Sequence, residues 1–129
     1  MQMEGHMTMQ DMSSRKMDNL YLEVQDKIKG LYQAIRDYTS LGLRMNQAKA
    51  DYEIEYSKRY LIERSKGRSN AEIDNTLDGN EEMAALKQMY KNLEVQYASQ
   101  QELINAIKLD VRTTENELNR EYGVEGKQL

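Results

Sequence analysis

Apolar side chains recur at alternating spacings of three and four residues along two long stretches of the chain. In residues 83–118, eleven positions follow this rule over five heptads, and only Gln100 and Thr114 among them are polar. Residues 17–56 follow the same rule. This spacing aligns side chains along one side of an α-helix, so each stretch is expected to form a long helix with one apolar seam.

The segment between the two stretches contains residues typical of helix ends. Gly67 suits the left-handed conformation that follows the last turn of a helix. Ser69 and Glu72 form a Ser-x-x-Glu capping box, which predicts a short helical segment to about Leu77. Asn80 then suits the N-cap of the second long helix. The sequence therefore predicts two long helices joined through a short one.

A connection confined to about residues 67–80 requires the two long helices to run antiparallel. The expected fold class is all-α, a long antiparallel helical hairpin of the coiled-coil type. Pairing the seam positions outward from the connection places Tyr56 opposite Tyr90 and Gly42 opposite Ile104. In this predicted register the two residue numbers of every pair sum to 145 or 146.

A continuous first helix would be unusually long. Between Met17 and Lys66 it would extend about 75 Å at about 1.5 Å per residue. In the sequence Thr39-Ser-Leu-Gly42 all but the leucine are poor helix formers, so a break near residues 39–42 is the alternative. The first long stretch would then form two helices.

The hairpin is expected to form a single domain over residues 14–122. Residues 1–13 and 123–129 are expected to be flexible ends. The step Gly5-His6-Met7 resembles a cloning junction followed by a second start, so residues 1–6 are expected to be vector-derived. On that interpretation the single histidine has no functional role.

The composition favours self-association of this hairpin. The 129 residues include 24 Leu, Ile and Val but no Phe or Trp, so the core is expected to be thin. Eleven apolar residues lie off the main seams and would widen the apolar surface beyond what one partner helix covers. We therefore expect a homo-oligomer. These residues are Leu20, Leu22, Tyr32, Leu41, Leu43, Ile54, Leu61, Ile62, Val95, Leu103 and Leu109.

Basic and acidic side chains are distributed unevenly. Residues 14–70 carry 12 basic and 8 acidic side chains, whereas residues 71–129 carry 6 basic and 12 acidic ones. Residues 56–68, at the expected tip of the hairpin, carry five cations and one acid. Such cations can neutralise nucleic-acid phosphates, and a tyrosine among them can stack on an unpaired base. The alternative is a solvated helix end, where the cations are attracted to the negative end of the helix dipole and to acids of the second helix.

The segment from Arg44 to Tyr60, RMNQAKADYEIEYSKRY, is followed by Ser-Lys-Gly-Arg at residues 65–68, an acidic stretch and a heptad helix. Over about residues 44–118 this pattern resembles small helical proteins encoded by bacteriophages. More loosely, it is similar to the UvsY-like recombination mediators of T-even phages. That resemblance implies a ring-forming protein that binds single-stranded DNA and helps a recombinase displace single-strand-binding protein. The residues expected to contact DNA are Lys58, Arg59, Arg64, Lys66 and Arg68, with Tyr60 as a stacking group.

The expected function is therefore that of a non-enzymatic phage or prophage accessory protein in DNA recombination. With no Cys and one His, the chain offers no thiolate, zinc site or nucleophile–base pair, so neither catalysis nor a cofactor is expected. No membrane or small-molecule partner is expected either, and the absence of Cys fits a cytoplasmic location, in the host if the chain is phage-encoded. The alternatives are a protein-directed inhibitor or adaptor, such as an anti-defence factor, and a virion assembly or scaffolding component.

Overall fold

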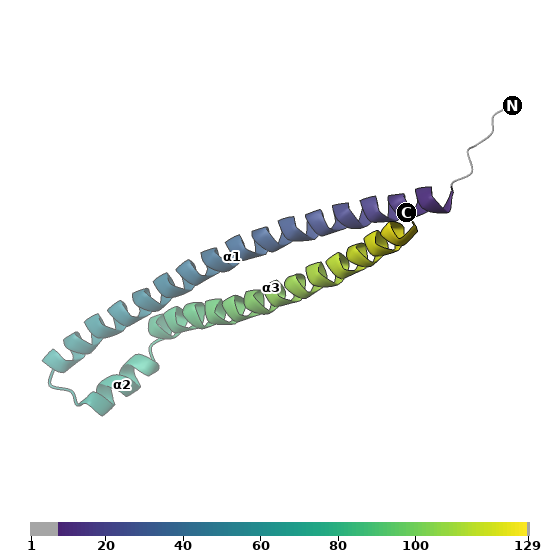
Figure 1. The fold of residues 1–129 in the computed structure, drawn as a ribbon. Helices are drawn as coiled ribbons and strands as arrows, with labels where there is room; N and C mark the ends of the chain where they lie inside the picture. The colour runs from purple at the N-terminus through teal and green to yellow at the C-terminus, as the bar shows by residue number, and fades with distance from the viewer. Residues whose placement is uncertain (1–7, 129) are drawn as a thin grey trace. The chain divides into compact units, whose positions relative to one another are not determined.

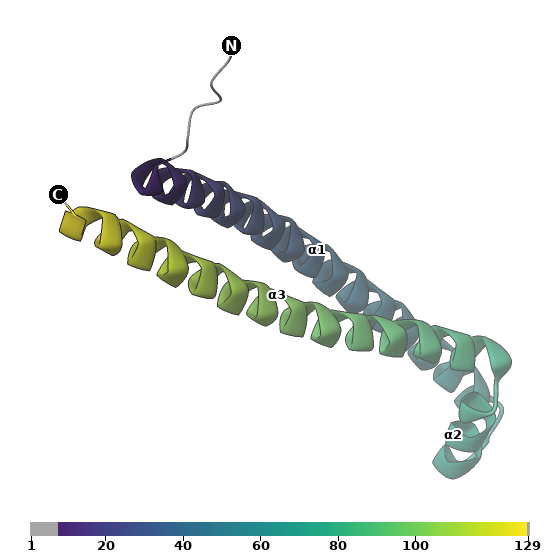
Figure 2. The ribbon, with the colours of Figure 1, turned by 90° about the vertical axis from the view of Figure 1, so that its right-hand side faces the viewer.

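The chain forms three α-helices in a computed structural model that describes residues 8–128 (Figure 1). They are α1 (Met9–Ser65), α2 (Asn70–Asp78) and α3 (Glu81–Gln128), and no described residue lies in a strand. Figures 1 and 2 both show α1 alongside α3, with α2 in the connection between them. The predicted all-α helical hairpin is confirmed. No helix among the described residues is both long enough and apolar enough to cross a membrane.

Helix α1 is continuous across residues 39–42, so the alternative break in the first helix is wrong. A single helical glycine costs only about 1 kcal/mol relative to alanine, and neighbouring packing can offset that cost. At Gly42 the neighbour is the ring of Tyr97, which lies so close that an added Cβ atom would be 3.1 Å from a ring carbon. The glycine therefore admits the ring and does not interrupt the helix.

Both long helices extend beyond the domain limits expected from the sequence. Helix α1 begins at Met9, where the Thr8 hydroxyl accepts a hydrogen bond from the Asp11 amide at 3.1 Å. Helix α3 continues to Gln128. The expectation that residues 1–6 are vector-derived concerns a part of the chain outside the described residues.

The connection between the long helices forms as its sequence predicts. Gly67 has a φ of 81°, and the Ser69 hydroxyl accepts a hydrogen bond from the Glu72 amide at 3.3 Å. The Asn80 side chain caps α3 by accepting a hydrogen bond from the Met83 amide at 3.0 Å. These local features were predictable because each depends on residues only a few positions apart.

The described chain divides into two compact units. The loop unit, residues 36–102, contains α2 and the adjoining parts of α1 and α3, and the terminal unit comprises residues 8–35 and 103–128. In the terminal unit Lys27 donates hydrogen bonds to Asp110 at 3.0 Å and to the buried Thr114 at 2.9 Å. Thr114, predicted as a polar seam position, therefore has its hydroxyl satisfied by a cation from the opposite helix. The surrounding core is apolar and includes Leu20, Val24, Ile104 and Val111.

The register of the loop unit differs from the predicted one. The ring of Tyr52 packs against Tyr90 with centroids 5.2 Å apart, whereas the prediction placed Tyr56 there. Gly42 lies against Tyr97, seven residues before its predicted partner Ile104. The prediction is therefore wrong by four residues at Tyr90 and by seven at Gly42. Two helices with the same heptad period fit equally well in registers seven residues apart, so the pattern alone cannot choose between them.

Helix α2 accounts for the direction of the register difference. Its residues Ile73 and Leu77 are buried, so α2 is packed into the end of the hairpin. Tyr56 donates a hydrogen bond to Asp74 of this helix at 2.7 Å. The predicted register paired Tyr56 directly with α3 and did not include this contact with the short helix.

Nine of the eleven apolar residues predicted to lie off the main seams are exposed. Only Leu20, which is buried, and Leu41, which packs against the core of the loop unit, are covered. The core of the loop unit is formed by Ala48, Tyr90 and Leu93 together with Leu41, Met45 and Tyr52. One partner helix therefore leaves a large part of the apolar surface in contact with solvent.

Replacing Ile73 by alanine is expected to weaken the attachment of α2. The side chain is fully buried, at 0% exposed, so truncation should cost about 2–5 kcal/mol. Hydrogen exchange of the α2 amides and urea unfolding would measure the loss. The matched control is Ile62→Ala, because Ile62 is exposed and its truncation should change the free energy of unfolding by less than about 0.5 kcal/mol. Equal effects of the two variants would contradict the packing described.

Candidate nucleic-acid interface at the loop end

Arg59 binds within the protein and links α1 to the start of α3. Its guanidinium contacts Glu55 one turn earlier at 2.9 Å, the Asn80 side chain at 2.8 Å, and Glu82. The side chain is 24% exposed. Hydrogen bonds to Glu55 and Glu82 raise the pKa of Arg59. Because Asn80 also caps α3, this arginine supports the hairpin, and its donors already have partners.

Tyr60 is also engaged inside the loop unit. Its hydroxyl donates a hydrogen bond to the Asn70 side chain at 2.5 Å, at the first residue of α2. Its ring lies next to that of Tyr56, with centroids 6.3 Å apart. The predicted stacking group therefore has an aromatic neighbour and a hydrogen-bond partner already, and its ring is half-buried.

Three of the predicted cations surround the end of α1. Glu63 binds Lys66 at 3.3 Å and Arg68 at 3.1 Å, and its own side chain is only 16% exposed. Lys66 and Arg68 are 54% and 44% exposed, so their remaining donors face solvent. The Arg64 residue is exposed, and its side chain has no ion pair or hydrogen bond among the described residues. This cluster, Arg64, Lys66 and Arg68, has one internal carboxylate against three cations.

Lys58 lies apart from this cluster. It precedes Arg64 by six residues, which places it about 9 Å away along α1 and about 120° around the helix. It is exposed, and no ion pair forms to it within the described part of the chain. The six residues predicted from sequence as one site are therefore not brought together. Arg59 and Tyr60 bind different partners within the loop unit, Lys58 lies on another side of α1, and Arg64, Lys66 and Arg68 cluster around its end.

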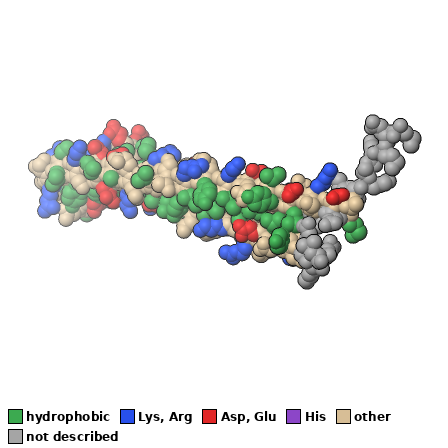
Figure 3. Space-filling model, turned by 45° about the horizontal axis from the view of Figure 1, so that its top comes forward, with side chains coloured by type: hydrophobic (Ala, Val, Ile, Leu, Met, Phe, Trp, Pro, Cys, Tyr) green, Lys and Arg blue, Asp and Glu red, His purple; other side chains and the backbone are tan. Residues whose placement is uncertain are grey.

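Acidic side chains of α2 and of the first turn of α3 share this end of the protein. They are Glu72, Asp74, Asp78, Glu81 and Glu82. Figure 3 shows basic and acidic side chains interspersed on the face that it draws. The sequence already signalled these acids through the negative charge of residues 71–129. The ion pair between Arg59 and Glu82 is of the kind expected for cations attracted to acids of the second helix.

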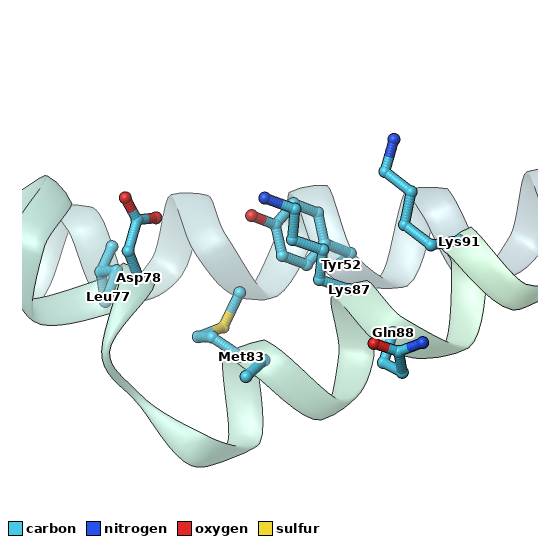
Figure 4. Close-up of a pocket in the computed structure, with 8 residues that line it drawn as sticks. Tyr52, Leu77, Asp78, Met83, Lys87, Gln88 and Lys91 are labelled. Carbon is cyan, nitrogen blue, oxygen red and sulfur yellow. The ribbon is translucent and has the colours of Figure 1, made fainter.

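A pocket of about 420 Å³ lies where the three helices of the loop unit meet. Figure 4 shows Tyr52 of α1, Leu77 and Asp78 of α2, and Met83 and Lys87 of α3 around it. Burial, followed by the charges of Tyr90 and Asp78, raises the pKa of Tyr52, so its phenol stays protonated at neutral pH. No group of three His, Cys, Asp or Glu side chains in the described chain is arranged to hold a metal ion.

Comparisons of the chain with protein-family models, with curated proteins and with solved structures give no match. The resemblance to phage recombination mediators therefore has only the residues quoted for it as support.

The Tyr56–Asp74 hydrogen bond is expected to make the stability of the fold depend on pH. That bond, then burial, then the charges of Asp74 and Asp78 raise the pKa of Tyr56 to about 12, whereas an unfolded tyrosine titrates near about 10. A raised pKa stabilises the fold while the phenol is protonated. The stabilisation should be complete below about pH 10 and disappear as the pH rises towards about 12.

Tyr56→Phe removes this bond and should lower the free energy of unfolding by about 1 kcal/mol at pH 8. Urea unfolding at pH 8, 10 and 11.5 should show the difference from the native chain shrinking as the pH rises. Tyr32→Phe is the control, because Tyr32 is exposed and should show no such pH-dependent difference. A constant difference for Tyr56→Phe across this range would contradict the assignment.

Proposed function

We propose that this protein is a non-enzymatic accessory factor in DNA recombination, of phage or prophage origin, which binds single-stranded DNA as an oligomer. The observation that carries the proposal is the exposed cluster of Arg64, Lys66 and Arg68 around the turn at Gly67. Guanidinium and ammonium groups on a protruding turn can reach successive phosphates of a flexible strand. Lys58, Arg59 and Tyr60 are not part of this contact, because they lie on another face or have partners in the fold.

The geometry favours weak, salt-sensitive contact by each copy of the chain. Glu63 already neutralises part of the charge on Lys66 and Arg68. If all three cations contact phosphates, the logarithm of the affinity should fall with the logarithm of the salt concentration with a slope of about −2 per copy. Several copies acting together would supply the affinity that one cluster lacks.

The test replaces Arg64, Lys66 and Arg68 together by glutamine. Fluorescence anisotropy with a labelled single-stranded oligonucleotide at low salt should show at least a tenfold loss of affinity and a shallower salt dependence. The matched control replaces Arg44, Lys49 and Lys87 by glutamine, which removes the same charge from elsewhere in the loop unit and should leave binding within about twofold. The idea is wrong if the native chain shows no salt-sensitive binding, or if both triple variants lose it equally.

The variant Arg59→Gln tests whether Arg59 stabilises the fold or contacts DNA. Because Arg59 joins α1 to Asn80 and Glu82, its loss should lower the free energy of unfolding by about 1–2 kcal/mol. The affinity for the oligonucleotide, measured where the variant is folded by circular dichroism, should stay within about twofold of the native value. A large loss of affinity in the folded variant would place Arg59 in the interface instead.

A second candidate function is that of a protein-directed adaptor or inhibitor. It is favoured by the acids of α2 and the start of α3, which give the loop end an anionic surface beside the basic cluster. Such a surface would dock on a basic patch of another protein. This candidate predicts no affinity for the oligonucleotide, together with co-purification of one defined protein that is lost when Glu72, Asp74 and Asp78 are replaced by their amides.

A further inference from the structure

The outer face of α1 in the loop unit carries a hollow of about 380 Å³ formed by this helix alone. Its lining residues are Ala50, Glu53, Ile54, Ser57, Lys58 and Leu61. Ile54 and Leu61 are 54% and 67% exposed. Ala48 and Tyr52, which pack in the core of the loop unit, lie on a different side of the same turns. The hollow is therefore a second, uncovered seam of α1, separate from the one that packs against α3.

Small and large side chains alternate along this second seam. Ala50 and Ser57 are seven residues apart, as are Ile54 and Leu61, and the two pairs alternate at spacings of four, three and four. These are the a and d spacings of a coiled coil, in which each large side chain inserts between residues of a facing helix. The partner that fits is a helix with large residues where this one has small residues.

We infer that the partner is a second copy of this chain, with the two α1 helices antiparallel. In an antiparallel pair the residue numbers of facing positions have a constant sum. If Leu61 of one copy faces Ala50 of the other, that sum is 111, so Ile54 faces Ser57. A two-fold axis repeats each contact, so every layer of the interface contains one large and one small residue. The surface is thus complementary to itself in this orientation.

Charge supports the same orientation. Asp51 and Lys58 lie one heptad apart on one edge of the seam, and together with Ile54 they line a neighbouring groove of about 580 Å³. Neither has an ion pair among the described residues. In an antiparallel pair this edge faces the same edge of the second copy, which brings Asp51 of each chain close to Lys58 of the other. Two ion pairs that the single chain leaves unmade are then formed.

A parallel pairing fits less well. It would place Ala50 against Ala50 and Ser57 against Ser57, so two layers would be underfilled. The heptad position that Ala50 and Ser57 occupy is taken one heptad later by Arg64. A parallel pair would therefore place the two Arg64 guanidinium groups next to each other. The antiparallel pair avoids both costs.

The pairing can be tested by disulfide formation, because the chain has no native cysteine. Ala50→Cys and Leu61→Cys are made as separate full-length variants and oxidised alone and as a mixture. The mixture should give covalent dimers, while each variant alone should give none above background. Within one chain the two positions are about 16 Å apart along α1, too far for a disulfide. Cross-linking of Ala50→Cys alone would show a parallel pair, and no cross-linking of the mixture would exclude the pairing; either result overturns the inference.

Charge exchange provides a second test that does not depend on cysteine variants. In sedimentation equilibrium, Asp51→Lys and Lys58→Asp should each weaken dimerisation at least tenfold, and the double variant should restore it. Glu53→Lys is the control, since Glu53 lies on the opposite edge and would approach Lys58 only in a parallel pair. Dimers that resist both single exchanges, or that are lost through Glu53→Lys alone, contradict the inference. The measurement needs no nucleic acid, so it separates failure of this pairing from failure of the proposed function.

Discussion

The loop unit depends on a register that only a few contacts can select. Two heptad helices slide past each other in equivalent steps of seven residues, and the apolar seams hardly distinguish one step from the next. At Gly42 the missing side chain makes room for the ring of Tyr97, which also stacks on Tyr38 with centroids 4.2 Å apart. Arg59 adds a polar contact to Asn80 at the start of α3. A shift by one heptad would remove the aromatic layer from the glycine and leave the guanidinium without its partner.

This register creates the space that α2 fills. With Tyr52 rather than Tyr56 against Tyr90, the last turns of α1 are free to contact the short helix. The hydroxyls of Tyr56 and Tyr60 donate hydrogen bonds to Asp74 and Asn70, respectively. A hydrogen bond to Tyr97, followed by burial, raises the pKa of Tyr38. The phenols thus combine apolar packing with hydrogen bonding. Tyrosine can occupy a thin, half-solvated core of this kind where phenylalanine would offer no polar group.

The features that could be predicted from the sequence are those that depend on residues close together in the chain. The turn at Gly67, the cap at Ser69 and the helical periods are local, and all formed as expected. The register is not local, because equal periods leave it undetermined. The partners of the predicted site residues are not local either, because a linear count of cations does not show the contacts that folding supplies. The ion pair of Arg59 with Glu55 could be predicted, because residues four positions apart lie side by side on a helix. The contacts of Arg59 with Asn80 and Glu82 could not, because they form only when the hairpin folds.

The inferred antiparallel dimer suggests how a chain with a net charge of −4 could bind a polyanion through one small basic cluster. In the antiparallel pair the two-fold axis crosses α1 midway between residues 55 and 56, so the two Arg64 residues lie 17 positions apart in register, about 25 Å along the paired helices. On the proposed function, a single cluster is expected to bind a strand weakly, because Glu63 and the acids of α2 offset part of its charge. Two clusters at this spacing make the second contact intramolecular once the first has formed, which raises affinity without any new contact within the chain. On the proposed function, a strand long enough to reach both clusters is expected to bind more tightly than a short one, whatever its base sequence.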